Sequence, residues 1–158
     1  MPGISGDKIF EQADHLPLAK EFGSAMAYAY AAGLADRAPD NFVLMEDKSS
    51  ETRLKIANID LTTTFQRIGS LEEVFNVLER LLIRKKSEHA LNRTIAASFI
   101  DSFHKEFTKI KEKAAGLKFD FKGYAQQKIE QALAHIAAAN PQTLRKQLLN
   151  HFQQIKPK

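Results

Sequence analysis

The sequence contains no cysteine, so the chain forms no disulfide bond and offers no thiolate ligand to a metal ion. It has no apolar run approaching the roughly 18 residues of a transmembrane helix. Its first ten residues, MPGISGDKIF, lack the charged and apolar regions of a classical signal peptide. These absences favour a cytoplasmic protein, or one delivered into a host cell by a specialised secretion system that reads other signals.

The composition is that of an ordinary globular domain. The chain has 158 residues, of which 44% are hydrophobic and 27% charged, and this argues against wholesale disorder. We therefore expect a single domain over residues 1–158. The net charge of +4 favours anionic partners such as nucleotides, phosphoinositides, a membrane surface or nucleic acid. An ordinary solvated surface explains the same charge.

Hydrophobic periodicity predicts a mainly α protein with one small β-hairpin. The predicted helices span residues 18–32, 70–86, 87–115, 124–139 and 141–154. The predicted strands span residues 42–45 and 54–60. Residues 1–15 are expected to form a loose lead-in, and residues 116–123 are the best position for a hinge. Such a small hairpin must pack on the helices to be stable.

Local signals mark where several helices begin and end. Gly33 is a plausible stop for the first helix. The sequence Ser70-Leu-Glu-Glu73 fits a capping box, in which Ser70 accepts from the Glu73 amide and Glu73 reaches back. Asn140 and Pro141 read as the N-cap and first residue of the last helix.

Three polar residues form the strongest candidate site. Asp36 and Asn41 lie in the stretch GLADRAPDNFVL, after the first helix, and Asp60 lies in IANIDLTTTF, after the hairpin. Phosphoryl transfer needs metal ions that bridge phosphate oxygens and a carboxylate that orients the attacking hydroxyl. Because Asp and Asn supply the oxygen ligands that Mg²⁺ prefers, these residues could serve that chemistry.

These two stretches resemble the catalytic core of the phosphatidylinositol kinases and their protein-kinase-like relatives. The family pattern is G-x-x-D-R-H-x-x-N, a strand pair and then I-D-F-G. The resemblance implies that Asp36 is the catalytic aspartate, that Arg37 holds the loop, and that Asn41 and Asp60 bind the metal. It covers residues 18–65, and it implies Mg²⁺ and ATP as cofactors and a helical kinase-C-lobe-like domain over the rest of the chain.

The sequence also departs from the family pattern. Ala38 replaces the family's His, and Leu61-Thr62 replaces the Phe-Gly that follows the metal-binding Asp. The sequence has no glycine-rich phosphate loop and no lysine in a V-A-I-K-like context. The resemblance therefore implies a fragment or a divergent relative, whose N-lobe is supplied elsewhere if it is active.

Two further readings stay open. Asp36, Asn41 and Asp60 are residue types that also cap turns and end strands. The protein would then be a plain helical bundle that acts as a non-catalytic interaction module, such as a bacterial effector or adaptor domain with a protein partner. Alternatively, Lys105 and Lys109 share a helix face and could contact an acidic surface. No aromatic residues interleave with these lysines, so nucleic-acid binding is not favoured.

Overall fold

The structure is a computed structural model that describes residues 4–11, 14–34, 37–59, 61, 69–83, 86–117 and 124–155. Its helices are α1 (His15–Ala32), α2 (Leu71–Leu81), α3 (His89–Ala115), α4 (Tyr124–Ala138) and α5 (Pro141–Gln154), with short 3-10 turns η1 (Gly6–Ile9), η2 (Pro39–Asn41) and η3 (Lys86–Glu88). Its strands are β1 (Ile4–Ser5), β2 (Phe42–Glu46) and β3 (Leu54–Asn58). The prediction of a mainly α fold with one small hairpin is confirmed.

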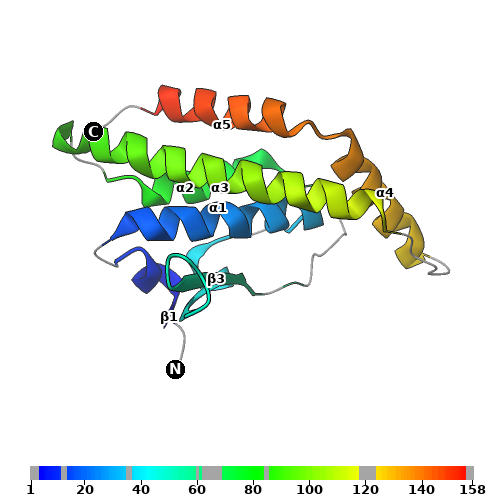
Figure 1. Ribbon diagram of the computed structural model, residues 1–158, viewed down its shortest axis with the longest axis horizontal. Helices are drawn as coiled ribbons and strands as arrows, with labels where there is room; N and C mark the ends of the chain where they lie inside the picture. Colours follow the sequence, from blue (N-terminus) through cyan, green and yellow to red (C-terminus); the bar gives the residue numbers. More distant parts are fainter. Residues whose placement is uncertain are drawn as a thin grey trace.

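The elements stack in layers, with α1 near the middle (Figure 1). Helix α1 contacts β3 of the sheet, and it also contacts α2 and the long helix α3. Helix α5 packs on α3, and α4 joins these two helices at one end of the molecule. The core therefore forms around α1, between the sheet and the other helices. None of the described helices is both long and apolar enough to cross a membrane.

Helix α1 is buried along most of its length. The predicted apolar stripe of Leu18, Phe22, Met26 and Tyr30 lies in the core, with exposures of 0–8%. Burying side chains of this size contributes about 1.5–3 kcal/mol each. The helix begins one turn before its predicted start, because Asp14 accepts a hydrogen bond from the Leu16 amide. It ends as predicted at Gly33, which adopts the left-handed conformation with a φ of 68°.

Helices α1 and α3 approach each other most closely at Gly23. A Cβ atom at this position would lie 2.3 Å from the Phe99 carbonyl oxygen and 2.9 Å from the Ser102 Cβ. Glycine is therefore required here by space, because any side chain would push the two helix backbones apart.

We expect Gly23→Ala to lower the free energy of unfolding by about 1–3 kcal/mol, the usual range for overpacking a core. The matched control is Gly116→Ala, because a Cβ there would meet nothing closer than 3.8 Å. Urea denaturation of both variants measures the difference. Equal stabilities of the two variants would contradict the close approach.

The segment before α1 differs from the expected loose lead-in. Strand β1 pairs with β2, with Ile4 opposite Leu44, so the hairpin becomes a three-stranded antiparallel sheet within the described residues. Ile9 is fully buried, and the Phe10 ring stacks on Phe22 with centroids 5.2 Å apart. Isolated apolar residues on such a short segment give no periodicity, so the sequence alone did not reveal this order.

The connection between α2 and α3 is held by a buried asparagine. Helix α2 ends at Leu81, before the predicted limit of residue 86. The Asn92 side chain then accepts from the Ile83 amide at 2.8 Å and donates to the Ile83 carbonyl at 2.7 Å. This pair replaces the hydrogen bonds that Ile83 would make if the helix continued.

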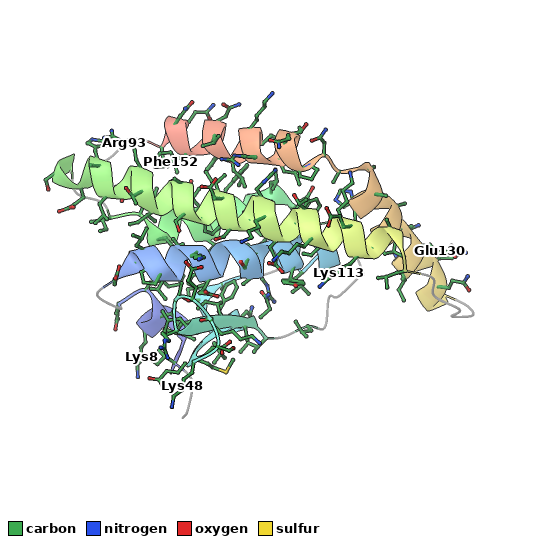
Figure 2. The ribbon with its side chains drawn as sticks, viewed as in Figure 1. Lys8, Lys48, Arg93, Lys113, Glu130 and Phe152 are labelled. Carbon is green, nitrogen blue, oxygen red and sulfur yellow. The ribbon has the colours of Figure 1, made fainter. Side chains whose placement is uncertain are left out.

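Helix α5 is fixed at both ends. The predicted cap is confirmed, since the Asn140 side chain accepts from the amides of Gln142 and Thr143. Near the C-terminal end, the His151 ring stacks on Phe75 at 4.0 Å, and its Nε2 lies 2.8 Å from Glu79 Oε1. Figure 2 shows Phe152 of α5 at the same end of the molecule as Arg93 of α3. Helix α5 is thereby tied to α2.

Candidate functional site

The structure describes two of the four residues predicted for the site. Arg37 and Asn41 lie between α1 and β2, whereas Asp36 and Asp60 lie outside the described residues. The chain neighbours Ile59 and Leu61, on either side of Asp60, are described. The geometry of the candidate site is therefore known from Arg37, Asn41 and the residues that contact them.

The loop between α1 and β2 is short and closely packed. Pro39 is buried and begins η2, and the Asn41 amide closes that turn by donating to the Ala38 carbonyl at 2.9 Å. The Asn41 carbonyl then accepts from the Ile59 amide at 2.9 Å, which extends the pairing of β2 and β3 by one residue pair. Asn41 therefore lies directly across from the last described residue before Asp60.

The Arg37 side chain joins this loop to the end of β3. Its guanidinium Nη1 donates to the carbonyl of Ile59 at 3.0 Å, to Oδ1 of Asn58 at 3.3 Å and to the carbonyl of Asn41 at 3.4 Å. Arg37 is only 4% exposed, and its guanidinium lies 5.7 Å from the centre of the Phe42 ring. One buried cation therefore links the residue that follows Asp36 to the residue that precedes Asp60.

Asn58 extends the same network into α1. Its Oδ1 accepts from Arg37, and its Nδ2 donates to the Ala25 carbonyl at 3.1 Å. The side chain thus bridges the middle of α1 and the Arg37 guanidinium. The sequence pattern predicts only a strand at Asn58. The available signal was its polarity within the apolar run IANID, since buried polar side chains have hydrogen-bond partners.

Glu73 anchors the loop to α2. Its Oε2 accepts from the Arg37 backbone amide at 3.1 Å. The predicted capping box is therefore wrong in its details, because Ser70 accepts from the Glu72 amide instead of the Glu73 amide. A carboxylate in the first turn of a helix can serve the helix N-terminus or a neighbouring amide, and here the amide belongs to the loop. Nothing local in the sequence identifies that partner.

Four titratable groups with perturbed pKa values lie on α1 and the β2–β3 turn. A hydrogen bond to Glu106 raises the pKa of Tyr28 to about 12, and burial raises the pKa of Tyr30. Ser49 lowers the pKa of the Asp47 carboxyl, and Lys20 lowers that of Glu51. Each shift has a structural cause, and the partners of Tyr28 and Glu51 lie on other elements of the fold.

The described residues contain no group of three or more histidine, aspartate or glutamate side chains arranged to hold a metal ion. Comparisons of the chain with models of known protein families, with curated proteins and with solved structures gave no match. The resemblance to the phosphatidylinositol kinases therefore rests on the residues quoted above. What the geometry adds is the Arg37 network that joins the two halves of the motif.

We expect Arg37→Lys to lower the free energy of unfolding by about 1–3 kcal/mol. Lysine keeps the charge but cannot reproduce the planar guanidinium that bonds Ile59 and Asn58. The matched control is Arg93→Lys, because Arg93 is exposed on α3. Chemical denaturation compares the two variants. If Arg37→Lys is as stable as Arg93→Lys, the guanidinium does not organise this junction.

Proposed function

We propose that this chain is a helical lobe of a divergent phosphotransferase related to the phosphatidylinositol-kinase-like enzymes. In this proposal Asp36 orients the acceptor hydroxyl, and Asn41 and Asp60 bind the Mg²⁺ that accompanies ATP. Arg37 takes a positioning role and does not contact the reacting groups. The observation that carries the proposal is the Arg37 guanidinium, which joins the Asp36–Asn41 loop to the strand that leads to Asp60.

Such a site requires precise placement of its ligands. Phosphoryl transfer depends mainly on holding metal ions and reactants in position, since the protein itself does little covalent chemistry. A loop between two elements cannot hold metal ligands precisely unless several neighbouring elements bond to it. Here the loop is bonded to β3 through Arg37, to α1 through Asn58 and to α2 through Glu73. That rigidity supports a site in which metal ligands from separate segments must converge.

The proposal needs partners for the nucleotide beyond this lobe. The glycine-rich loop and lysine of kinases are missing from the sequence, so another domain or protein would supply the remaining phosphate contacts. The acceptor would be a hydroxyl group of a nucleotide, a phosphoinositide or a protein. The net charge of +4 would favour the first two, because they carry phosphate groups. The same proposal places the protein's activity in the cytoplasm, or in a host cell into which the protein is delivered.

A non-catalytic interaction module is the second candidate. It is favoured by two large apolar side chains that flank Asp60 in the sequence, since Ile59 is 38% exposed and Leu61 is 55% exposed. It is also favoured by Ala38 and Leu61-Thr62, which replace residues of the kinase pattern. In that case the Arg37 network only shapes a surface that binds another protein.

Thermal unfolding with Mg-ATP and with Mg-ADP distinguishes the two candidates. A ligand that binds only the native state raises the unfolding midpoint, by roughly 4 °C at a tenfold excess over its Kd for a chain of this size. We expect this rise for the wild type and its loss in Asp60→Asn. The control variant is Asp40→Asn, which alters an exposed carboxylate of the same loop outside the proposed ligand set.

The outcomes separate clearly. A rise in the wild type and Asp40→Asn that is absent in Asp60→Asn would support the nucleotide–metal site. A rise that survives in Asp60→Asn would contradict the ligand assignment. No rise in any of the three proteins at millimolar nucleotide would contradict nucleotide binding by this chain and favour the interaction module.

A further inference from the structure

One face of α3 carries a row of exposed lysines. Lys105, Lys109 and Lys113, which we call the lysine row, follow one another at four-residue intervals, and all three are exposed. Residues four apart lie on the same side of a helix, and each step advances about 6 Å along its axis. The row therefore spans about 12 Å. Figure 2 shows Lys113 near the end of α3 that approaches α4.

Two acidic side chains of α3 that flank the row have partners elsewhere. Asp101, one turn before the row, forms an ion pair of 2.7 Å with Arg145 of α5. Glu106 accepts a hydrogen bond from the hydroxyl group of Tyr28 on α1. Glu112 is exposed and offsets part of the positive charge. The carboxylates at the two sides of the row are therefore committed to other helices.

The lysines themselves are not neutralised in the same way. Among the residues that the structure describes, none forms an ion pair with Lys109 or Lys113. The nearer end of the row approaches the β2–β3 turn, where the bond with Lys20 lowers the pKa of Glu51 and the charge of Lys105 adds to the effect. The half of the row toward α4 therefore presents charges that this part of the chain leaves open.

An exposed aromatic ring lies beside the row. Tyr28 is 49% exposed, although most of α1 is buried. Its hydroxyl group is bonded to Glu106, which precedes Lys109 by three residues on the same helix. Tyrosine is enriched among the residues that contribute most to binding at protein–protein interfaces. A ring of this kind next to a line of charge is suited to contact with another protein.

The spacing of the row favours a helix as its partner. Acidic residues at four-residue intervals on a second helix advance by the same distance, about 6 Å, so they can pair one to one with the lysines. A helix whose four-residue row follows that of α3 crosses it at about 50°, the commonest packing angle between helices. This crossing limits the contact to a few ion pairs, which matches the length of the row.

Two other anionic surfaces fit the row less well. Electrostatic binding to a membrane depends on clusters of about four to eight basic residues, whereas the lysine row has three. A single-stranded nucleic acid is bound through several aromatic rings on which successive bases stack, and Tyr28 is a single ring whose hydroxyl group is already bonded. The observations therefore favour an acidic helix.

We propose that the lysine row and Tyr28 form a docking face for an acidic helix of a partner protein. Glutamate or aspartate side chains at four-residue spacing on that helix pair with the three lysines, and the Tyr28 ring contacts its apolar side. Exposed ion pairs are individually weak and are screened by salt, so the complex is transient and sensitive to ionic strength. This docking does not depend on nucleotide binding.

Two labelled alanine-rich peptides of about 20 residues test the docking face, since peptides of that length form helices in water. They have the same composition, but one carries three glutamates at four-residue spacing and the other carries them at adjacent positions. Fluorescence anisotropy at low ionic strength, without nucleotide, measures their affinities for the whole chain. We expect the spaced peptide to bind roughly tenfold more tightly, and added salt to remove the difference.

Variants then locate the binding. Lys109→Gln/Lys113→Gln should lose the preference for the spaced peptide. The matched control, Lys48→Gln/Lys146→Gln, removes the same charge from two exposed lysines of the β2–β3 turn and α5, and it should keep the preference. Tyr28→Ala should weaken binding of the spaced peptide several-fold, because it removes the ring. Urea denaturation checks that each variant is folded.

Several results would overturn the proposal. These are equal affinities for the two peptides, no saturable binding of the spaced peptide at about 1 mM, or a preference that survives in Lys109→Gln/Lys113→Gln. Loss of the preference in the control variant would show a general effect of charge and would overturn it as well. Vesicles of phosphatidylcholine with phosphatidylserine and a thymidine oligonucleotide are the competing ligands. Tighter binding of either one through Lys109 and Lys113 would replace the acidic helix by a membrane or a nucleic acid.

Discussion

The burial of one cation constrains everything around the candidate site. A guanidinium removed from water is costly unless most of its donors find acceptors, so the Arg37 side chain requires oxygen atoms to converge on it. Those oxygens come from Asn41, Asn58 and Ile59, on two separate segments. Because Asn58 also bonds α1, the requirement fixes the hairpin relative to the central helix. The same set of hydrogen bonds therefore determines both the conformation of the loop and the position of the sheet on α1.

Neighbouring residues of the motif make different kinds of contact. Arg37 adjoins Asp36 in the chain, and the resemblance alone groups it with the catalytic residue. Within the described part of the chain, its Nη1 donates to the backbone oxygens of Asn41 and Ile59 and to the amide oxygen of Asn58, as expected of a positioning residue. Asn58 and Glu73 join it in that role, although neither belongs to the motif. The chemistry proposed for Asp36, Asn41 and Asp60 would thus depend on three residues that never meet a substrate.

Periodicity and caps were sufficient to predict the helices, because those signals depend on residues a few positions apart. The end of α1 at Gly33 and the cap at Asn140 are of this kind. The hydrogen bond of Glu73 with Arg37 and that of His15 with Leu81 could not be predicted, since the two partners lie 36 and 66 positions apart along the chain. The segment of residues 4–11 could not be predicted for a related reason. Its order comes from pairing with β2 and packing on Phe22, and two-residue strands have no periodicity of their own.

The pairing of α1 with α3 has a consequence for how the chain is made. Helix α1 leaves the ribosome well before α3, with a bare glycine surface at Gly23. The residues of α3 that face Gly23, which are Phe99, Ser102 and Phe103, are synthesised much later. At the usual 5–20 residues per second, the delay is on the order of several seconds. During that interval α1 can pack on the sheet and on α2, which are already made, but its face at Gly23 stays uncovered until α3 follows.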